Sequence, residues 1–299
     1  MMRFAGETAA LGTALCWAAG SNFFAAAGRS MGSRVLNRLR ITTAAVFLSL
    51  ALMATHGAPW PVWATRPQVL LLAVSGLIGF VFGDTWYFRS LVILGPGRAA
   101  LIASLAPVFT VFIAWPVLHE LPGPLAALGM ALTLGGVAWV VSARATARTE
   151  HAEGSVAMGV FAGVLGALGQ AGGYVLSKMA MRSGIDPLSA TVIRVTSAMV
   201  AVWILATAER AVPETLGALR DRRASAFMAG GAFCGPFMGV TLSLLALRYV
   251  QAGVASSITA IYPVFTMLIA SRVHSEPLTR RAILGALVAV AGVVVLFLR

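Results

Sequence analysis

The segment Pro107-Val108-Phe109-Thr110 recurs 156 residues further along the chain as Pro263-Val264-Phe265-Thr266. At the same shift, residues 97–140 match residues 253–296 at 16 of 44 positions without a gap. Shared apolar composition would give identity at roughly a tenth of these positions by chance. The chain therefore contains an internal duplication, and this duplication decides how the rest of the sequence is interpreted.

The duplication extends beyond this segment into both halves of the chain. The first predicted helices of the two halves align at a shift of 153 residues, which pairs Gly6 with Gly159 and Gly20 with Gly173. Further pairs, at the shift of 156, are Arg38 with Arg194, Gly79 and Gly83 with Gly235 and Gly239, Glu120 with Glu276, Gly129 with Gly285, and Gly136 with Gly292. Each half is therefore one structural repeat.

The composition identifies the environment of these repeats. Of the 299 residues, 59% are hydrophobic and only 11% are charged, and the mean hydropathy is +0.88. Soluble domains carry about 25% charged residues, so an ordinary soluble enzyme, a disordered tail and a coiled coil are excluded. The net charge of +12 comes from basic residues spread over the gaps between apolar stretches. This distribution is typical of membrane-flanking charge rather than of a nucleic-acid interface.

Apolar runs of about 20 residues predict membrane-spanning helices. Ten such runs lie at residues 5–27, 33–55, 68–91, 97–117, 123–142, 155–178, 187–208, 225–247, 253–272 and 280–298. The polar stretch 143–154 separates the predicted first repeat, 1–142, from the predicted second repeat, 155–299. Because five helices is an odd number, the second repeat must be inverted in the membrane. The expected fold is an all-α polytopic membrane protein with ten transmembrane helices in two inverted five-helix repeats around a central cavity.

Inverted repeats are typical of secondary transporters, which bind their substrate near the bilayer midplane between the repeats. Pro107 and Pro263 lie inside the fourth and ninth predicted helices, where proline removes a backbone hydrogen bond. A matched pair of interrupted helices predicts the substrate site; two harmless kinks are the alternative. Ser104, one turn before Pro107, and Tyr262, beside Pro263, are expected to border this site.

Two glycine pairs mark the third and eighth predicted helices. Gly79 and Gly83 in the third helix correspond to Gly235 and Gly239 in the eighth. Small residues four positions apart allow two helix backbones to approach closely. We expect the third and eighth helices to cross each other near the pseudo-two-fold axis, with these glycines serving as a packing surface or as a hinge.

Asp84 is the acidic residue that lies deepest in a predicted span. A charge at the centre of a transmembrane helix costs at least about 2.5–3.5 kcal/mol, so it must be paired, protonated or turned towards a polar cavity. One interpretation is a contact with a substrate ammonium or with a proton. The other is a structural ion pair with an arginine, for which the candidates are Arg89, Arg38 and Arg194.

Aromatic and polar residues cluster in the same predicted helices. The remaining candidates for substrate contact are Trp17, Ser21, Asn22, Trp86, Tyr87, Gln170, Tyr174 and Ser243. Aromatic faces hold cations, and the amides of Asn22 and Gln170 are costly in lipid, so they should point inward. Each aromatic residue alone is more often part of a core, but the group near the matched prolines predicts a pocket.

Glu120 and Glu276 occupy matching turns before the fifth and tenth predicted helices. A carboxylate in such a turn stabilises the positive end of a helix, so both are interpreted as structural. Cys16 and Cys234 belong to no metal-binding spacing, and the histidines form no metal motif. The sequence therefore predicts no metal, no cofactor and no enzyme active site.

The repeated Pro-Val-Phe-Thr segment, the turn glutamates and the glycine-rich last helix of each half resemble the EamA-type transporters of the drug/metabolite transporter superfamily. The resemblance covers nearly the whole chain. The first helix, with Trp17, Ser21 and Asn22, and the aromatic third helix are most similar to the YddG aromatic amino acid exporters. The resemblance implies that helices 1, 3, 4, 6, 8 and 9 line the cavity and that helices 5 and 10 lie at the periphery.

The resemblance also implies export of amino acids, drugs or other metabolites, and a place in the bacterial inner membrane. The small four-helix members of the superfamily carry a glutamate in the middle of the first helix. Here Glu7 lies near the start of that helix, which argues against a simple glutamate-based proton antiport.

The predicted function is export of aromatic or neutral amino acids and related small metabolites by alternating access. The alternative is a multidrug or organic-cation exporter of the same fold, in which Asp84 holds the cation. A phosphorylated-sugar transporter would need paired basic residues deep in the cavity, whereas Lys178, Arg38 and Arg194 lie near predicted helix ends. The predicted partners are a small-molecule substrate and the lipid bilayer, without nucleic acid, and a monomer is the expected state.

Overall fold

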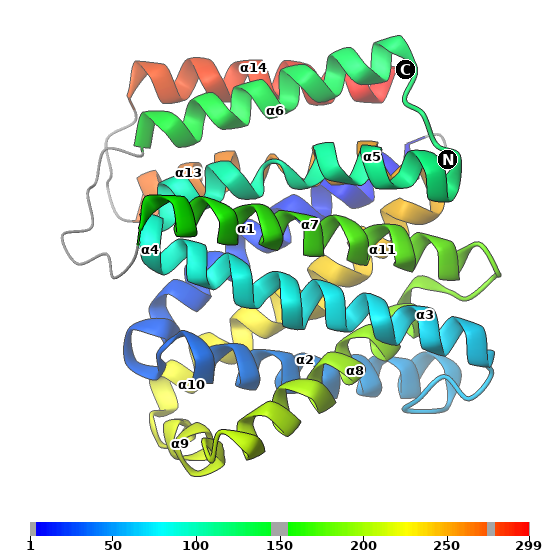
Figure 1. The fold of residues 1–299 in the computed structure, drawn as a ribbon, viewed down its shortest axis with the longest axis vertical. Coiled ribbons are helices and arrows are strands. Elements are labelled where there is room, and N and C mark those ends of the chain that lie inside the picture. Colours follow the sequence, from blue (N-terminus) through cyan, green and yellow to red (C-terminus); the bar gives the residue numbers. More distant parts are fainter. Residues whose placement is uncertain (1–3, 145–154, 274–278, 299) are drawn as a thin grey trace.

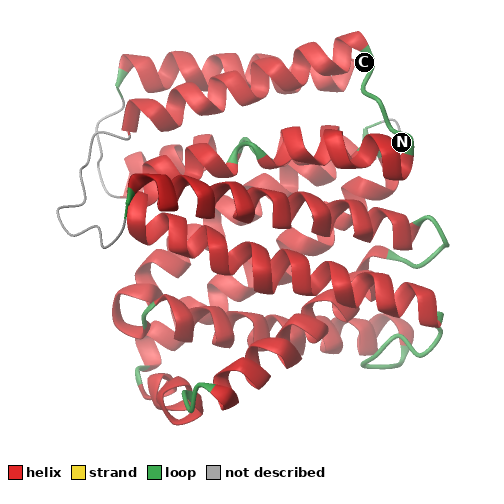
Figure 2. Ribbon diagram, viewed as in Figure 1, coloured by secondary structure: helices red, strands yellow, loops and turns green. Residues whose placement is uncertain are grey.

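The ten apolar runs determine the architecture. A computed structural model of the protein describes residues 4–144, 155–273 and 279–298, and these residues form helices joined by short loops, without strands (Figure 2). Within them, ten helices are long and apolar enough to cross a membrane. The predicted all-α polytopic fold is therefore confirmed. All but the first two residues of the polar stretch 143–154 lie outside the described residues.

The elements of the first repeat are α1 (Ala5–Met31), α2 (Ser33–His56), α3 (Arg66–Gly76), the π-helical segment η1 (Leu77–Gly83), α4 (Asp84–Ala103), α5 (Ala106–Leu118) and α6 (Pro124–Arg144). Those of the second repeat are α7 (Val156–Met181), α8 (Pro187–Ala208), α9 (Val212–Gly217), the 3-10 turn η2 (Ala218–Arg220), α10 (Arg222–Ala232), the π-helical segment η3 (Phe233–Gly239), α11 (Val240–Tyr249), α12 (Ala252–Thr259), α13 (Tyr262–Val273) and α14 (Arg280–Leu298). Several of these elements join end to end, so one membrane span can contain two or three of them.

Local side chains explain where several helices begin. A helix start leaves backbone N–H groups without partners, and a short polar side chain before the helix accepts from one of them. Ser155 accepts from the N–H of the third residue of α7 at 3.2 Å, and Asp186 does the same for α8 at 2.9 Å. Asp221 accepts from the Ala224 N–H of α10 at 3.0 Å, and this bond lowers the pKa of the Asp221 carboxyl group.

The two repeats exchange their first helices. In Figure 1, α1 lies among elements of the second repeat, and its packing partners include α10, η3, α11 and α13. Correspondingly, α7 opens the second repeat but packs against α3, η1, α4 and α5 of the first. Both chain termini lie at the same end of the molecule (Figure 1). This reciprocal arrangement is what two inverted copies related by a pseudo-two-fold axis require.

The last helix of each repeat lies at the edge of the molecule. Figure 1 shows α6 and α14 side by side, beyond α5 and α13. Glycines bring these two helices into backbone contact, because a Cβ atom at Gly136 would lie 2.3 Å from the Ala289 nitrogen, and one at Gly292 would lie 2.3 Å from the Thr133 nitrogen. The predicted peripheral position of the fifth and tenth spans is therefore confirmed.

Candidate functional site

The glycine pairs of the third and eighth spans lie in two matching π-helical segments. η1 and η3 are seven residues long and occupy equivalent positions in the two repeats, with Gly79 and Gly83 in η1 and Gly235 and Gly239 in η3. A π-helical turn is rare and occurs mostly at functional sites, because it widens the helix and changes the direction of the following side chains. The paired segments therefore mark the interior of both repeats as a candidate site.

These glycines pack against the first helix of the opposite repeat. A Cβ atom at Gly169 of α7 would lie 2.7 Å from the Gly83 Cα, and one at Gly20 of α1 would lie 3.2 Å from the Gly235 nitrogen. The prediction that the third and eighth helices cross each other is wrong: η1 crosses α7, and η3 crosses α1. Small residues at this spacing indicate a close approach without identifying its partner, and the partner helices supply glycines of their own.

Two candidates on α1 face elements of the second repeat. The Trp17 indole lies on η3, where its ring atoms are 3.3 Å from the Cβ positions at Gly235 and Gly239. One turn further along α1, the Ser21 hydroxyl oxygen lies 3.4 Å from that of Thr266, the last residue of the repeated segment. The first helix thus connects the π-helical segment of the eighth span with the interrupted ninth span.

Both proline-containing spans are interrupted immediately before the proline. In the fourth span, α4 ends at Ala103 and α5 begins at Ala106; in the ninth, α12 ends at Thr259 and α13 begins at Tyr262. Pro107 and Pro263 therefore occupy the first turn of the second segment, where a missing N–H leaves no hydrogen bond unmade. The expected interruptions are present at equivalent places in the two repeats.

Three polar candidates donate hydrogen bonds to their own helices. Such local bonds satisfy the donor and leave an oxygen able to accept from another group. The bonds run from the Asn22 amide to the Ala18 carbonyl at 2.8 Å, from the Ser104 hydroxyl to the Leu101 carbonyl at 2.6 Å, and from the Ser243 hydroxyl to the Val240 carbonyl at 2.8 Å.

Three tyrosines bring interior helices of both repeats together. The Tyr87 hydroxyl of α4 interacts with the Tyr262 hydroxyl at the start of α13. The Tyr174 hydroxyl of α7 interacts with that of Ser243 on α11. All three tyrosines are half-buried, so each ring keeps some accessible surface in the middle of the spans that the repeats share.

Asp84 is paired, but with an arginine that was not among the candidates. Its carboxylate forms an ion pair with Arg40 of α2 and accepts from the Gln170 amide of α7 at 3.0 Å. Asp84 and Arg40 are 8% and 4% exposed. The Arg40 guanidinium also lies over the rings of Phe24 and Phe88, 5.4 and 5.8 Å from their centroids. Burial and three neighbouring helices hold this charged pair in one geometry.

Sequence reasoning overlooked Arg40 because the duplication drew attention to its neighbour Arg38. Arg38 forms an ion pair with Glu209 and donates to the Thr215 hydroxyl at 3.3 Å, near the start of α9. Its position in the sequence could have identified Arg40. It lies seven residues into α2, inside the predicted apolar span, where a charged side chain needs a partner.

Trp86 lies apart from the other aromatic candidates. Its ring contacts the exposed Phe82 and Phe161 at centroid distances of 6.2 and 6.1 Å, and Arg89 lies over it at 5.4 Å. Arg89 is itself exposed. These neighbours place Trp86 on the outer face of α4 and α7, whereas Tyr87 on the same helix points inward.

Arg194 is buried in the interior, although the sequence indicated a position near a helix end. It is 2% exposed and lies two turns inside α8. Its guanidinium carbon is 5.0 Å from the centroid of the Phe80 ring, and the charge acts on the nearby Tyr174. The predicted span 187–208 has the same bounds as α8, so the error lay in treating a position two turns inside the helix as its end.

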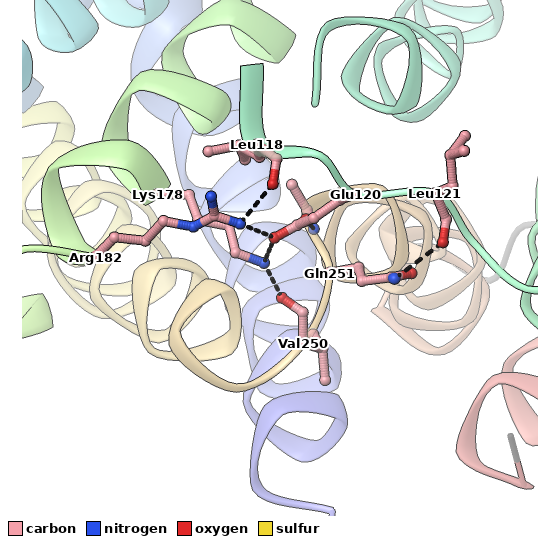
Figure 3. A network of polar contacts seen from close by, with 8 residues as sticks. Leu118, Glu120, Leu121, Lys178, Arg182, Val250 and Gln251 are labelled. Atoms are coloured by element: carbon pink, nitrogen blue, oxygen red, sulfur yellow. Dashed lines mark hydrogen bonds and ion pairs between the residues drawn. The ribbon is translucent and has the colours of Figure 1, made fainter. Parts of the chain in front are cut away.

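Glu120 joins the two repeats at the end of the molecule that carries the termini. One carboxylate oxygen lies 2.7 Å from the Lys178 ammonium and 3.1 Å from the Arg182 guanidinium, and the other accepts from the Ala252 N–H at 2.9 Å (Figure 3). Lys178 also donates to the Val250 carbonyl at 2.5 Å. The carboxylate therefore stabilises the start of α12, in the second repeat, rather than the fifth helix that follows it in sequence. Glu276, its counterpart, lies outside the described residues.

We expect Glu120→Gln to lower the stability of the purified protein by about 1.5–3 kcal/mol, since hydrogen bonds to a charged group are lost in a partly buried setting. The measurement is the thermal unfolding temperature in detergent. Glu214→Gln is the matched control, because Glu214 is exposed on α9 and takes part in no ion pair among the described residues. Equal unfolding temperatures for the two variants would contradict the role assigned to Glu120.

Comparison with known proteins agrees with this architecture. The model of the EamA-like transporter family matches residues 4–142 and 157–298. A solved crystal structure has the same fold, with a TM-score of 0.71 over 99% of this chain and 98% of that chain, at 18% sequence identity. No curated protein sequence matches the chain significantly.

Proposed function

The chain belongs to the EamA-like transporter family, and we propose that it exports aromatic or neutral amino acids and related small metabolites across a bacterial inner membrane. The observation that carries the proposal is the contact between Tyr87 and Tyr262. It joins one repeat to the other next to the break before Pro263, where a transporter of inverted repeats holds its substrate. Aromatic walls with hydroxyl groups suit a side chain that is flat or apolar and a polar amino acid backbone.

The arrangement of the repeats supports alternating access. The π-helical segments η1 and η3 contact the exchanged helices α7 and α1 through glycines. Because glycine contacts have no interlocking side chains, two rigid groups of helices can shift against each other there at small cost. The Glu120 cluster, which consists of Glu120, Lys178 and Arg182, holds the repeats together at one end. In alternating access the substrate site opens to one side of the membrane and then to the other, and this exchange requires ion pairs such as those of the Glu120 cluster to form and break in turn.

The pairing of Asp84 argues against the alternative of an organic-cation exporter. That function would need a carboxylate free to hold the cation, and Asp84 is already neutralised by Arg40 and bonded to Gln170. A cation could displace Arg40 only by leaving its guanidinium buried without a partner, which is strongly unfavourable. The structure therefore supports a structural role for the carboxylate.

The test of the proposed function is counterflow in proteoliposomes. Vesicles loaded with unlabelled L-phenylalanine should accumulate labelled L-phenylalanine, with L-leucine and an organic cation as comparison substrates. Each measurement is made with and without a pH gradient, which identifies proton coupling. Folded protein that moves no amino acid in any of these conditions would refute the proposal.

We expect Tyr262→Phe to reduce phenylalanine counterflow by roughly threefold to tenfold, because it removes one hydroxyl contact worth about 0.5–1.5 kcal/mol while keeping the ring. The control is Tyr249→Phe, which removes the hydroxyl of a tyrosine that is 47% exposed at the end of α11. A rate for Tyr262→Phe that equals that of the control would remove Tyr262 from the substrate site.

A further inference from the structure

The guanidinium of Arg194 occupies a space that glycines keep open. A Cβ atom at Gly79 of η1 or at Gly173 of α7 would lie 3.3 Å from its terminal nitrogen. At Gly76, a Cβ atom would lie 2.2 Å from the Arg194 carbonyl oxygen. Glycines of α3, η1 and α7 thus let the backbone approach Arg194 closely, and the charge is held between α8, α7 and η1.

Within the described residues, no carboxylate balances this charge. Among the residues that the structure describes, Arg194 forms no ion pair and donates no hydrogen bond, and its Nε–H is buried without an acceptor. Its neighbours are the face of Phe80 and the Tyr174 hydroxyl group. A buried ion without a partner costs several kcal/mol even after the protein has relaxed, so the free protein holds this charge at a cost that a bound anion would offset.

The duplication provides an internal comparison. The counterpart of Arg194 in the first repeat is Arg38, which is balanced by Glu209 and Thr215. By the same shift of 156 residues, the counterpart of Glu209 is Met53. The second member of the arginine pair has therefore no acid at the position where the first has one. Of two equivalent arginines, one has a resident counter-ion and the other does not.

The groups around Arg194 fit a carboxylate. A guanidinium presents two parallel N–H donors that match the two oxygens of a carboxylate. The Tyr174 hydroxyl, which interacts with Ser243, is a further polar group near the guanidinium. One helical turn away on the same face of α7, Gln170 holds Asp84, so aromatic and polar groups continue towards the Tyr87–Tyr262 contact.

We propose that Arg194 binds the carboxylate group of the transported substrate. This assignment rests on the proposed function, because it places the carboxylate of an amino acid beside the interrupted spans. It goes further in naming the class of ligand: a small organic carboxylate supplies the missing negative charge. An amine or an amide of the same size would leave Arg194 unbalanced.

The test compares binding of three probes to the purified protein: L-phenylalanine, hydrocinnamate, which lacks the ammonium group, and L-phenylalaninamide, which lacks the carboxylate. The wild type should bind the two carboxylates at least about tenfold more tightly than the amide, in line with a hydrogen bond to a charged group. Arg194→Gln should remove this preference, and Arg194→Lys should restore part of it. Arg38→Gln is the matched control and should keep it. The thermal unfolding temperature of Arg194→Gln without ligand should equal or exceed that of the wild type, since an unbalanced charge is removed.

The outcomes separate this inference from the proposed function. Equal affinity of the wild type and Arg194→Gln for both carboxylates would overturn the inference, whether or not phenylalanine is transported. No binding of either carboxylate by folded wild type would overturn it as well. Arg194-dependent binding of hydrocinnamate without any binding or transport of amino acids would support the carboxylate site and refute amino acid export.

Discussion

Arg40→Met is expected to destabilise the protein by about 3–5 kcal/mol, because it leaves the Asp84 carboxylate buried without its partner. The pair lies among α2, α4 and α7, and both side chains are less than a tenth exposed. The carboxylate would keep only the bond from Gln170. Thermal unfolding in detergent measures the effect, and a large fall in the yield of folded protein is part of the expected result.

The double variant Arg40→Met, Asp84→Leu is expected to recover most of the lost stability, because replacing both members of a buried pair by apolar groups is often neutral. Arg89→Met is the matched control: Arg89 lies on the same span as Asp84 but is exposed. The single variant and the double variant would unfold at the same temperature if the pair made no contribution. An Arg89→Met protein as unstable as Arg40→Met would also contradict the interpretation.

Gly136→Ala is expected to disrupt the packing of α6 on α14. Overpacking a core typically lowers the free energy of unfolding by about 1–3 kcal/mol, and we expect a loss at or above the upper end of this range. The added Cβ atom would lie 2.3 Å from the Ala289 nitrogen and 2.6 Å from the Gly285 carbonyl oxygen. Because both contacts are with backbone atoms, the two helices must move apart as rigid bodies. Thermal unfolding is again the measurement.

The neighbouring glycine provides the control for this prediction. In the described part of the chain, a Cβ atom at Gly135 would have no packing neighbour from another helix within 4 Å. Gly135→Ala should therefore be neutral or slightly stabilising, since alanine favours a helix by about 1 kcal/mol over glycine. If the two alanine variants unfold at the same temperature, the backbone contact between α6 and α14 is not what holds the pair together.

The sequence was sufficient to predict the ten spans, the duplication and the broken fourth and ninth spans, whereas the peripheral place of the fifth and tenth came from the family resemblance. The spans and their breaks depend on apolar run length and on proline, which act locally. The helix that a glycine surface contacts, by contrast, is distant in sequence and cannot be identified from the glycines alone. Gly79 and Gly83 indicated a tight crossing, and only the folded chain shows that α7 is on the other side.

The candidate site was harder to predict than the fold. The π-helical geometry of η1 and η3 could not be recognised from their amino-acid composition, because glycine and phenylalanine also occur in ordinary helices. Asp84 stood out as a buried charge, but its partner Arg40 is 44 residues away along the chain and on another helix. The predicted bounds of the helix that carries Arg194 agree with α8, but the sequence does not show that the first turns of this helix are buried. Trp86 and Tyr87 are neighbours in sequence, and only the packing of α4 shows that the Trp86 side chain points outward and the Tyr87 side chain inward.

The pairing of α6 with α14 also sets an order of events during biosynthesis. α6 enters the membrane as the last helix of the first repeat, yet the helix that covers its glycine face, α14, closes the second repeat and is synthesised much later. Until then, Gly129 and Gly136 lack the helix that packs on them in the folded protein. The first repeat therefore cannot complete its packing until α14 of the second repeat has entered the membrane.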